Sequence, residues 1–265
     1  PAGEAAAEGA WAIPFLIEER RVAKVGPNRV LEVPLEIGPG LGFLTRSLLE
    51  KKASVVAVEK DPLYAKFLRG YFKDRAFALL EKDILKTDLK KDLGFSEPVK
   101  VAGNIPYNIT SPIVEWLVSQ KSLVSEAVLT VQREVAERLG AQPGGKTWGP
   151  LSVFAQFHAE VSLLRRIGRE SFYPPPKVDS AVARLVFLKK PPARVDDEAA
   201  FFALIRRAFQ KRRKMLLNSL TDEASPALSR PAVQAALERA GIASTRRPET
   251  LSLAEWAGLS SEFIR

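Results

Sequence analysis

Short β-rich segments alternate with helical segments from about residue 35 to 190, and this alternation constrains the fold more than any other feature of the chain. The expected strands are Val33–Ile37, Ser54–Val58, Phe77–Leu80, Val99–Ala102, Ala127–Val131, Val161–Ile167 and Ala181–Leu188. The expected helices between them are Leu41–Glu50, Pro62–Tyr71, Pro112–Ser119, Arg133–Leu139 and Leu151–Phe157. The pattern predicts an α/β fold with a seven-stranded, mostly parallel, doubly wound sheet whose last two strands form a hairpin.

The composition changes at Lys189-Lys190-Pro191-Pro192, and the chain beyond this point is helical in pattern. The expected helices there are Asp196–Gln210, Lys211–Leu220, Pro231–Arg239 and Leu253–Leu259. The sequence therefore predicts a large domain over residues 1–192 and a small helical domain over residues 193–265. Residues 1–12 are expected to be a flexible leader.

The residue content excludes several kinds of chemistry. There is no cysteine, so disulfides, thiolate metal sites and cysteine nucleophiles are ruled out, and a reducing cytoplasm is favoured. The single histidine, His158, cannot form a histidine metal cluster and is interpreted as structural, so no metal is expected. No apolar run reaches the ~20 residues of a membrane helix, and no membrane partner is expected.

A glycine-rich turn follows the first expected strand. Gly38-Pro39-Gly40-Leu41-Gly42 differs from the dinucleotide pattern G-x-G-x-x-G, but its glycines let a ligand approach the backbone closely. Glu59 ends the next strand 21 positions after Gly38, and an acid at about that spacing commonly accepts from ribose hydroxyls. Asp83 ends the third strand and is able to accept from an adenine amino group. The alternatives are that Glu59 is an ordinary surface residue at a strand end and that Asp83 is a surface turn residue.

The segment Asn104-Ile105-Pro106-Tyr107 lies between a strand and the helix start Ser111-Pro112. In open α/β sheets, ligands bind at this carboxyl edge. An amide oxygen accepts from an exocyclic amine, proline holds the turn, and a tyrosine ring stacks on a flat base. These are the parts that hold a flipped-out adenine, although an ordinary strand-to-helix turn is the alternative.

A proline-rich loop, Ser171-Phe172-Tyr173-Pro174-Pro175-Pro176-Lys177-Val178-Asp179-Ser180, separates the last two strands. Such a stiff loop presents its two aromatic rings at low entropic cost. A polyproline stretch or a structural crossover is the alternative, but the position of the loop favours a wall of a base-binding site.

A net charge of +9 and a pI near 9.7 favour a polyanionic partner. The positive charge is concentrated in residues 206–214, which carry six cations and no acid. Like charges this close repel one another unless an anion binds. The predicted RNA contacts are Arg206, Arg207, Lys211, Arg212, Arg213 and Lys214.

Four motifs occur in a fixed order: the glycine turn at 38–42, Asn104–Tyr107, Phe172-x-Pro174-x-Pro176-Lys177-Val178, and Gln210-Lys211-Arg212-Arg213-Lys214-x-Leu216-x-Asn218. In this order the chain resembles the S-adenosylmethionine-dependent rRNA adenine N6-dimethyltransferases. The basic segment and the tail Arg247–Leu253 resemble the small-subunit branch. The resemblance implies a Rossmann-like class I methyltransferase domain and an RNA-contacting helical domain.

The resemblance also implies residue roles. Gly38 lies against the methionine part of the cofactor, Glu59 binds its ribose, and Asp83 binds its adenine amino group. Asn104 lies between cofactor and target base, Tyr107 stacks on that base, and Phe172 closes its other face. The remaining predicted cofactor contacts are Leu16, Gly40, Lys60 and Ile84. Ile105 offers a backbone carbonyl to the base, and Pro106 holds the turn.

The chain departs from the family before the glycine turn. A Gln-Asn-Phe-Leu-like segment usually covers the cofactor, whereas this chain has Ile13-Pro14-Phe15-Leu16, so Leu16 matches and proline replaces the asparagine. The expected reaction is dimethylation of N6 on two adjacent adenosines near the 3′ end of small-subunit rRNA, by a cytoplasmic monomer acting on the immature subunit. The alternatives are a large-subunit rRNA methyltransferase of the macrolide-resistance type, a DNA adenine methyltransferase, and an RNA-binding assembly factor whose catalysis is dispensable.

Overall fold

The computed structural model describes residues 34–264. The expected leader over residues 1–12 and the segment containing Leu16 lie outside this range. The strands are β1 (Pro34–Ile37), β2 (Val55–Glu59), β3 (Phe77–Glu81), β4 (Val99–Asn104), β5 (Val124–Gln132), β6 (Ala159–Ile167) and β7 (Ser180–Phe187). The helices are α2 (Phe43–Glu50), α3 (Pro62–Tyr71), α4 (Leu89–Leu93), α5 (Thr110–Ser119), α6 (Arg133–Leu139), α7 (Pro150–His158), α8 (Glu198–Gln210), α9 (Leu216–Leu220), α10 (Arg230–Arg239) and α11 (Leu253–Ile264).

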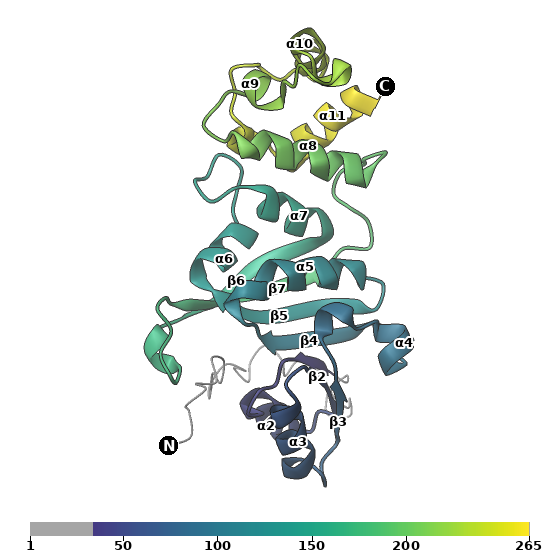
Figure 1. The fold of residues 1–265 in the computed structure, drawn as a ribbon, viewed down its shortest axis with the longest axis vertical. Helices are drawn as coiled ribbons and strands as arrows, with labels where there is room; N and C mark the ends of the chain where they lie inside the picture. Colours follow the sequence, from purple (N-terminus) through teal and green to yellow (C-terminus); the bar gives the residue numbers. More distant parts are fainter. Residues whose placement is uncertain (1–33, 265) are drawn as a thin grey trace. The chain divides into compact units, whose positions relative to one another are not determined.

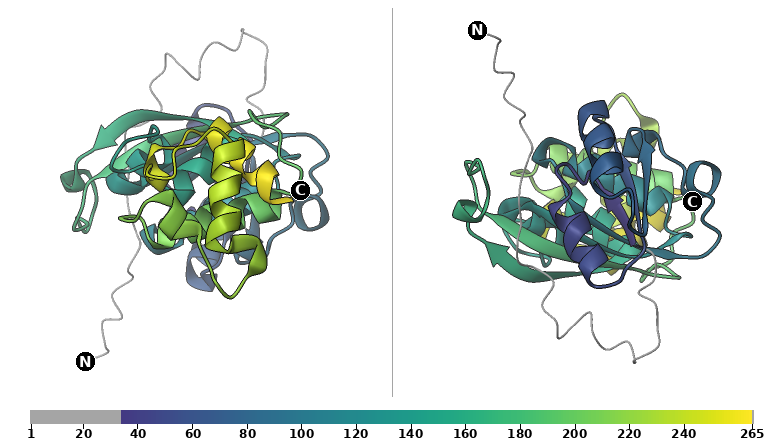
Figure 2. Two further views of the ribbon diagram at one scale, coloured as in Figure 1. Left: turned by 90° about the horizontal axis from the view of Figure 1, so that it is seen from above. Right: turned by 90° about the horizontal axis from the view of Figure 1, so that it is seen from below.

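The seven strands form one sheet in the order β3-β2-β1-β4-β5-β7-β6, which confirms the predicted doubly wound sheet. The pairs from β3 to β5 are parallel, and β7 runs antiparallel to β5. Strand order reverses direction between β1 and β4, which is the point where ligands bind in open α/β sheets. Helices α2 and α3 pack beside β2 and β3, and α5 packs beside β5 (Figures 1 and 2).

Helix α3 illustrates how local sequence sets the helix boundaries. Asp61 caps it by accepting from the backbone N–H groups of Leu63 and Tyr64, and Pro62 occupies the first helical turn. Ala65 and Leu68 are buried against the sheet. The predicted range of this helix is confirmed residue for residue. By contrast, α5 begins at Thr110 rather than at the predicted start Ser111-Pro112.

The chain divides into two compact units. The first comprises residues 34–136 and 162–187, and the second comprises residues 137–161 and 188–264. The second unit therefore takes in α7, which precedes the sequence boundary expected at residue 192. Among the described residues, no helix is both long and apolar enough to cross a membrane.

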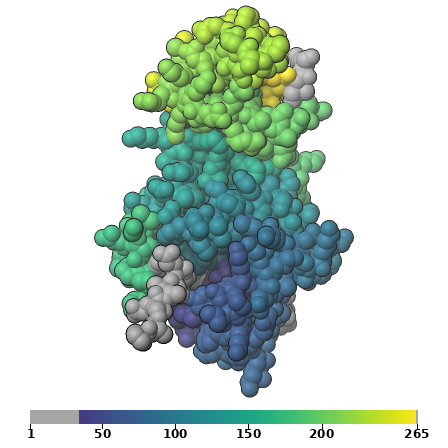
Figure 3. Space-filling model, viewed as in Figure 1, coloured from purple at the N-terminus to yellow at the C-terminus, as the bar shows by residue number. Residues whose placement is uncertain are grey.

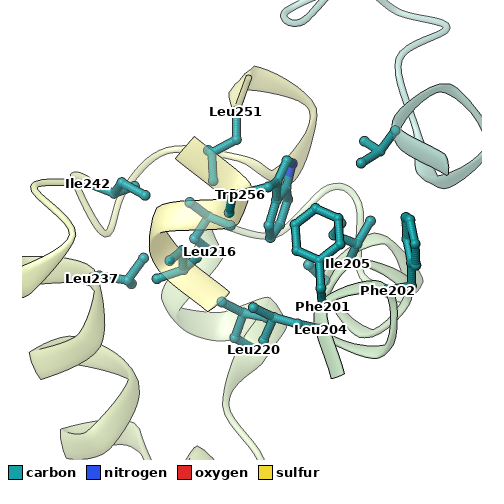
Figure 4. Close-up of a cluster of buried hydrophobic side chains, with 14 of the residues drawn as sticks. Phe201, Phe202, Leu204, Ile205, Leu216, Leu220, Leu237, Ile242, Leu251 and Trp256 are labelled. Atoms are coloured by element: carbon teal, nitrogen blue, oxygen red, sulfur yellow. The ribbon is translucent and has the colours of Figure 1, made fainter. Parts of the chain in front are cut away.

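The second unit has its own hydrophobic core. Helix α8 is capped by Asp197, whose side chain accepts from Ala200 N at 2.9 Å, and its buried residues recur with helical spacing. Figure 4 shows Phe201, Ile205, Leu216 and Trp256 of this core, which is closed by residues from α7 to α11. In Figure 3 the residues after 196, in green and yellow, form a closely packed surface.

The tail that resembles the small-subunit branch has a structural role inside the second unit. The indole of Trp148 donates to Leu251 O at 3.0 Å, and Gly144 N donates to Glu249 O at 2.7 Å. Arg246 pairs with Glu255, and hydrogen bonding from Arg246 lowers the pKa of Glu255 to about 2. The tail therefore holds the loop after α6 against α11.

One helix prediction is wrong in part. The helix expected over Lys211–Leu220 begins only at Leu216. Residues 211–214 instead form a turn, closed by a hydrogen bond from Lys214 N to Lys211 O at 2.8 Å. A helix would place Lys211 and Lys214 three residues apart on one face, where like charges are destabilising.

Candidate active site

The strand register brings four predicted site segments to one edge of the sheet. Ile37 pairs with Val58 on one side and with Gly103 on the other. The next residues along the three strands, which are Gly38 of the glycine turn, Glu59 and Asn104, therefore lie at the same edge of the sheet. Glu59 in turn pairs with Glu81, two residues before Asp83. Backbone bonds continue beyond the strands, from Gly38 N to Val58 O and from Lys82 N to Glu59 O, both at 2.9 Å.

The glycines of the turn serve two different purposes. Gly38 and Gly40 have φ values of 61° and 56°, and a Cβ atom at either would meet nothing within 4 Å. Glycine is required there by the backbone conformation, and the space above both residues is open. At Gly42 a Cβ would lie 2.7 Å from the Phe72 ring and 2.8 Å from Leu68. Gly42 therefore packs the turn against α3, while Gly38 and Gly40 form an open cradle.

Glu59 ties the cradle to the end of β2. Its carboxylate is 7% exposed and accepts from Gly40 N at 3.1 Å and from Asp61 N at 2.8 Å. Each oxygen accepts one backbone hydrogen bond and keeps capacity for a second. The same side chain thus positions the glycine turn and can accept from a ligand's hydroxyl groups.

Asp83 is held by the cation that precedes α3. Lys60 Nζ lies 2.9 Å from Asp83 Oδ2, and Leu85 N donates to Oδ1 at 3.1 Å. The hydrogen bond from Lys60 is the main cause that lowers the pKa of Asp83, so this acid is an acceptor at neutral pH. Lys60, predicted as a cofactor contact, acts in the structure on Asp83. Ile84 is buried at 6% exposure and begins the short helix over Ile84–Lys86.

The segment Asn104–Tyr107 turns at the end of β4. Asn104 pairs with Thr130 of β5 and is partly exposed, whereas Ile105 is buried and its N–H donates to Thr130 O at 3.0 Å. Pro106 has φ −55° and is exposed. The preceding Gly103 is tightly packed, because a Cβ there would lie 2.8 Å from Ile105 and 3.1 Å from the carbonyl oxygen of Ile37. The turn is therefore anchored on both neighbouring strands.

Tyr107 is anchored by a residue that the sequence did not indicate. Its hydroxyl lies 2.7 Å from Ser180 Oγ, at the first residue of β7. Nothing in the spacing of the chain links these positions, which are 73 residues apart. Only the strand order, which places β7 beside β5, shows that they meet.

The aromatic loop is fixed at its base by Asp179. This residue accepts from Arg133 Nη1 at 3.0 Å through its side chain and from Arg133 N at 3.0 Å through its carbonyl. Phe172 is 4% exposed and packs with Ile167 and Val182. Its role against a base stays a prediction. The sequence did not indicate this contact between Asp179 and Arg133.

A buried acid lies directly before the glycine turn and was also missed. Glu36 of β1 is 1% exposed, and Thr45 of α2 donates to its Oε2 at 2.6 Å. Burial raises the pKa of Glu36 to about 7, with a further contribution from the charge of Glu59. The pair joins β1 to the helix that follows the glycine turn.

The six predicted RNA-contacting cations have two kinds of environment. Arg207 pairs with Asp222 at 2.9 Å, and Arg212 donates to Lys146 O at 2.6 Å. Both are half-buried and serve the second unit's own structure. The others are exposed, namely Arg206, Lys211, Arg213 and Lys214.

The residues at the sheet edge fit the cofactor that the resemblance implies. An open left-handed cradle suits a polar chain that approaches the backbone, a buried carboxylate suits ribose hydroxyls, and an ionised aspartate suits an adenine amine. Gly38 and Gly40, Glu59 and Asp83 supply these groups from three adjacent strands. The two carboxylate acceptors and the open glycine turn therefore fit S-adenosylmethionine, and none of these residues would have to be replaced.

Comparison with known proteins identifies relatives of this chain. The family model described as ribosomal RNA adenine dimethylase matches residues 22–264. The chain is similar to the "Ribosomal RNA small subunit methyltransferase A" of Anaeromyxobacter dehalogenans (strain 2CP-C), with 43% identity over 96% of this chain and 92% of that protein. The protein of the same name from Clostridium botulinum (strain Kyoto / Type A2) is 39% identical over 93% of this chain and 90% of its own.

Two solved structures are also similar. The 23S rRNA methyltransferase ErmE has a TM-score of 0.65 and 29% identity, with 92% of this chain and 96% of that chain covered. A dimethyladenosine transferase from Plasmodium falciparum has a TM-score of 0.71 and 25% identity, with 87% of this chain and 89% of that chain covered.

Proposed function

This chain belongs to the ribosomal RNA adenine dimethylase family, and we propose that it transfers methyl groups from S-adenosylmethionine to N6 of two adjacent adenosines near the 3′ end of small-subunit rRNA. The observation that carries the proposal is the register that brings Gly38, Glu59 and Asn104 to one edge of the sheet. The similarity to proteins named for the small subunit supports the choice of RNA.

Three groups would hold the cofactor. The backbone at Gly38 and Gly40 would receive the methionine part, Glu59 the ribose hydroxyls, and Asp83 the adenine amino group. When bound, the cofactor supplies a methyl group already activated on a sulfonium. The chain's own task is therefore to align an acceptor with that methyl group and to exclude water. Such positioning contributes up to roughly 7–11 kcal/mol in ideal cases.

The acceptor would be held at Asn104–Tyr107. An adenine amine is a poor nucleophile because its lone pair is delocalised into the ring. The side-chain oxygen of Asn104 and the carbonyl of Ile105 would accept its two hydrogens and favour a tetrahedral nitrogen with an exposed lone pair. Tyr107 and Phe172 would stack on the base, with roughly 1–3 kcal/mol for each base–ring contact. After the first transfer the methylated nitrogen would lose one proton to solvent, so one hydrogen would remain and a second transfer is chemically feasible.

The exposed cations Arg206, Lys211, Arg213 and Lys214 would contact rRNA phosphates. We place the protein on the immature small subunit in the cytoplasm, acting as a monomer. If binding alone supports subunit maturation, Asn104→Ala will abolish methylation and leave assembly intact, which would identify an assembly role separate from catalysis.

Methylation of large-subunit rRNA is the second candidate, supported by the similarity to ErmE at 29% identity. The 43% identity with a small-subunit enzyme favours the first candidate. Purified small and large subunits, each incubated with labelled cofactor, separate the two. Incorporation into the small-subunit RNA supports the proposal, and incorporation into the large-subunit RNA alone refutes it.

A further inference from the structure

The hairpin of β6 and β7 carries an aromatic and basic surface that the proposed chemistry does not use. Its loop, residues 168–179, projects beyond the ends of the two strands (Figures 1 and 2). β6 is at the edge of the sheet, and residues 162–166 of this strand are exposed. Residues 162–187 of the hairpin belong to the first unit, as do β4 and β5.

The two aromatic residues of the loop point in different directions. Phe172 is in extended conformation, with φ −119° and ψ 150°, and successive extended residues direct their side chains to opposite sides. Phe172 is accordingly 4% exposed, whereas Tyr173 is 83% exposed. Tyr173 has the highest exposure among the large apolar side chains of the described residues. A ring in this position contributes little to the fold and is available to a partner.

The loop backbone around Tyr173 is held in place before any partner binds. Three prolines follow it, and Pro176 among them is buried. Asp179 fixes the end of the loop through its bonds with Arg133, and its side chain also accepts from Arg169 N at 3.3 Å. An aromatic ring on a stiff loop loses little conformational entropy on binding.

The hairpin that carries Tyr173 is rich in exposed cations. Four cations within residues 162–179 are exposed, and they outnumber Glu170, the exposed acid of that range. These cations are Arg165, Arg166, Arg169 and Lys177. An exposed ring among cations matches single-stranded nucleic acid, which offers base faces and phosphates together.

The hairpin is also close to the site of chemistry. Asn104 pairs with Thr130, which pairs with Val182, and Phe172 packs on Val182. Two strand spacings correspond to about 10 Å. Ser180, directly after the loop, holds the Tyr107 hydroxyl. Phe172, next to Tyr173 in the chain, therefore packs about two strand spacings from Asn104.

We propose that Tyr173 stacks on a nucleotide that flanks the target adenosine, and that the exposed cations of the hairpin contact the phosphates next to it. The inference rests on the proposed function, since it takes RNA as the substrate. Tyr173 would then be a second base-contacting residue, outside the methylation pocket. Its contact with the flanking nucleotide would determine how the single-stranded substrate enters.

The full-length protein is tested with an RNA hairpin that presents two adjacent adenosines in its loop, with 2-aminopurine at a flanking position. Tyr173→Ser should weaken binding about tenfold or more, as loss of one stacked base implies, and should abolish the quenching of 2-aminopurine. Tyr173→Phe keeps the ring and should stay within about threefold of wild type. Tyr71→Ser, which removes another exposed tyrosine, on α3, should bind like wild type.

The charges are tested separately by the salt dependence of binding. Arg165→Gln combined with Arg166→Gln should reduce the slope of log K against log salt by about 1–2. Lys73→Gln combined with Arg75→Gln, which removes two exposed cations elsewhere in the same unit, should leave the slope unchanged.

Three results would overturn the inference. If Tyr173→Ser binds and quenches like wild type while Asn104→Ala abolishes methylation, the stacking role is refuted and the proposed function stands. If Tyr173→Ser weakens binding to intact subunits but not to RNA, the loop contacts a protein. If the wild-type protein methylates neither ribosomal subunit, the proposed function fails, and the inference fails with it.

Discussion

The hydroxyl of Tyr107 lies 2.7 Å from Ser180 Oγ, and this contact joins the turn after β4 to the first residue of β7. Tyr107 belongs to the proposed base-binding turn, and Ser180 directly follows the aromatic loop. The contact fixes the tyrosine ring in one orientation. A ring that is already oriented loses less entropy when it stacks on a base.

Removing this contact should reduce catalysis without removing the ring. We expect Tyr107→Phe and Ser180→Ala each to lower kcat/KM about 3–10-fold, in line with about 1 kcal/mol for a hydrogen bond. The double variant should be no worse than either single variant, because both remove the same interaction. Steady-state methylation rates test this, and additive losses would show that the two residues act independently.

Glu59→Gln should impair cofactor binding in particular. The carboxylate accepts from both Gly40 N and Asp61 N, whereas an amide has one acceptor oxygen and would turn an N–H group towards one of these donors. We expect the Kd for S-adenosylmethionine to rise about 10–100-fold, as for loss of a hydrogen bond to a charged group. Calorimetric titration measures it. Glu81→Gln, at the paired position on β3, should change the Kd less than threefold. An equal rise in Kd for Glu59→Gln and Glu81→Gln would contradict the role of Glu59 in cofactor binding.

Glu36 should make stability depend on pH with a defined sign. Burial raises its pKa from 4.5 to about 7, so the folded state binds this proton more tightly than the unfolded state. The contribution of Glu36 to stability is therefore full below pH 4.5 and is lost as pH rises to about 7, by about 3 kcal/mol in total. Relative to wild type, Glu36→Gln should gain that amount over the same window.

Denaturant titrations of Glu36→Gln and wild type from pH 4.5 to 8 measure the difference. Glu50→Gln, which removes an exposed acid of α2, is the matched control and should follow the wild-type curve. Parallel curves for Glu36→Gln and wild type would show that Glu36 titrates normally in the folded protein.

Variants should distinguish the cations of residues 206–214 that contact RNA from those that stabilise the fold. We expect Arg213→Gln combined with Lys214→Gln to lower the slope of log K against log salt for rRNA binding by about 1–2. Arg207→Gln should instead lower the melting temperature, because it breaks the pair with Asp222, and it should change the slope less. An unchanged slope in the double variant would remove these two cations from the interface.

The sequence predicted the parts of the fold and the site that depend on local patterns. The strand end at Glu59 follows from a hydrophobic run that stops at a polar residue, and the start of α3 follows from Pro62. The fourth strand, predicted to end at Ala102, continues to Asn104. The ordered motifs predicted the family, which the comparisons confirm.

The features that the sequence missed depend on contacts between distant segments. Ser180 meets Tyr107 only because β7 inserts beside β5, and the burial of Phe172 depends on Val182 of the same strand. The helix expected from Lys211 begins only at Leu216, after a turn closed by the backbone bond from Lys214 N to Lys211 O. The assignment of α7 to the second unit depends on packing with α8, which local pattern does not reveal.

The most direct test of the account is mass spectrometry of rRNA from small subunits incubated with the purified protein and S-adenosylmethionine. The account predicts two adjacent N6,N6-dimethyladenosines near the 3′ end, and for Asn104→Ala a rate at least about 100-fold lower with RNA binding retained. Unmodified small-subunit RNA after incubation with the wild-type protein, or an undiminished rate with Asn104→Ala, would contradict it.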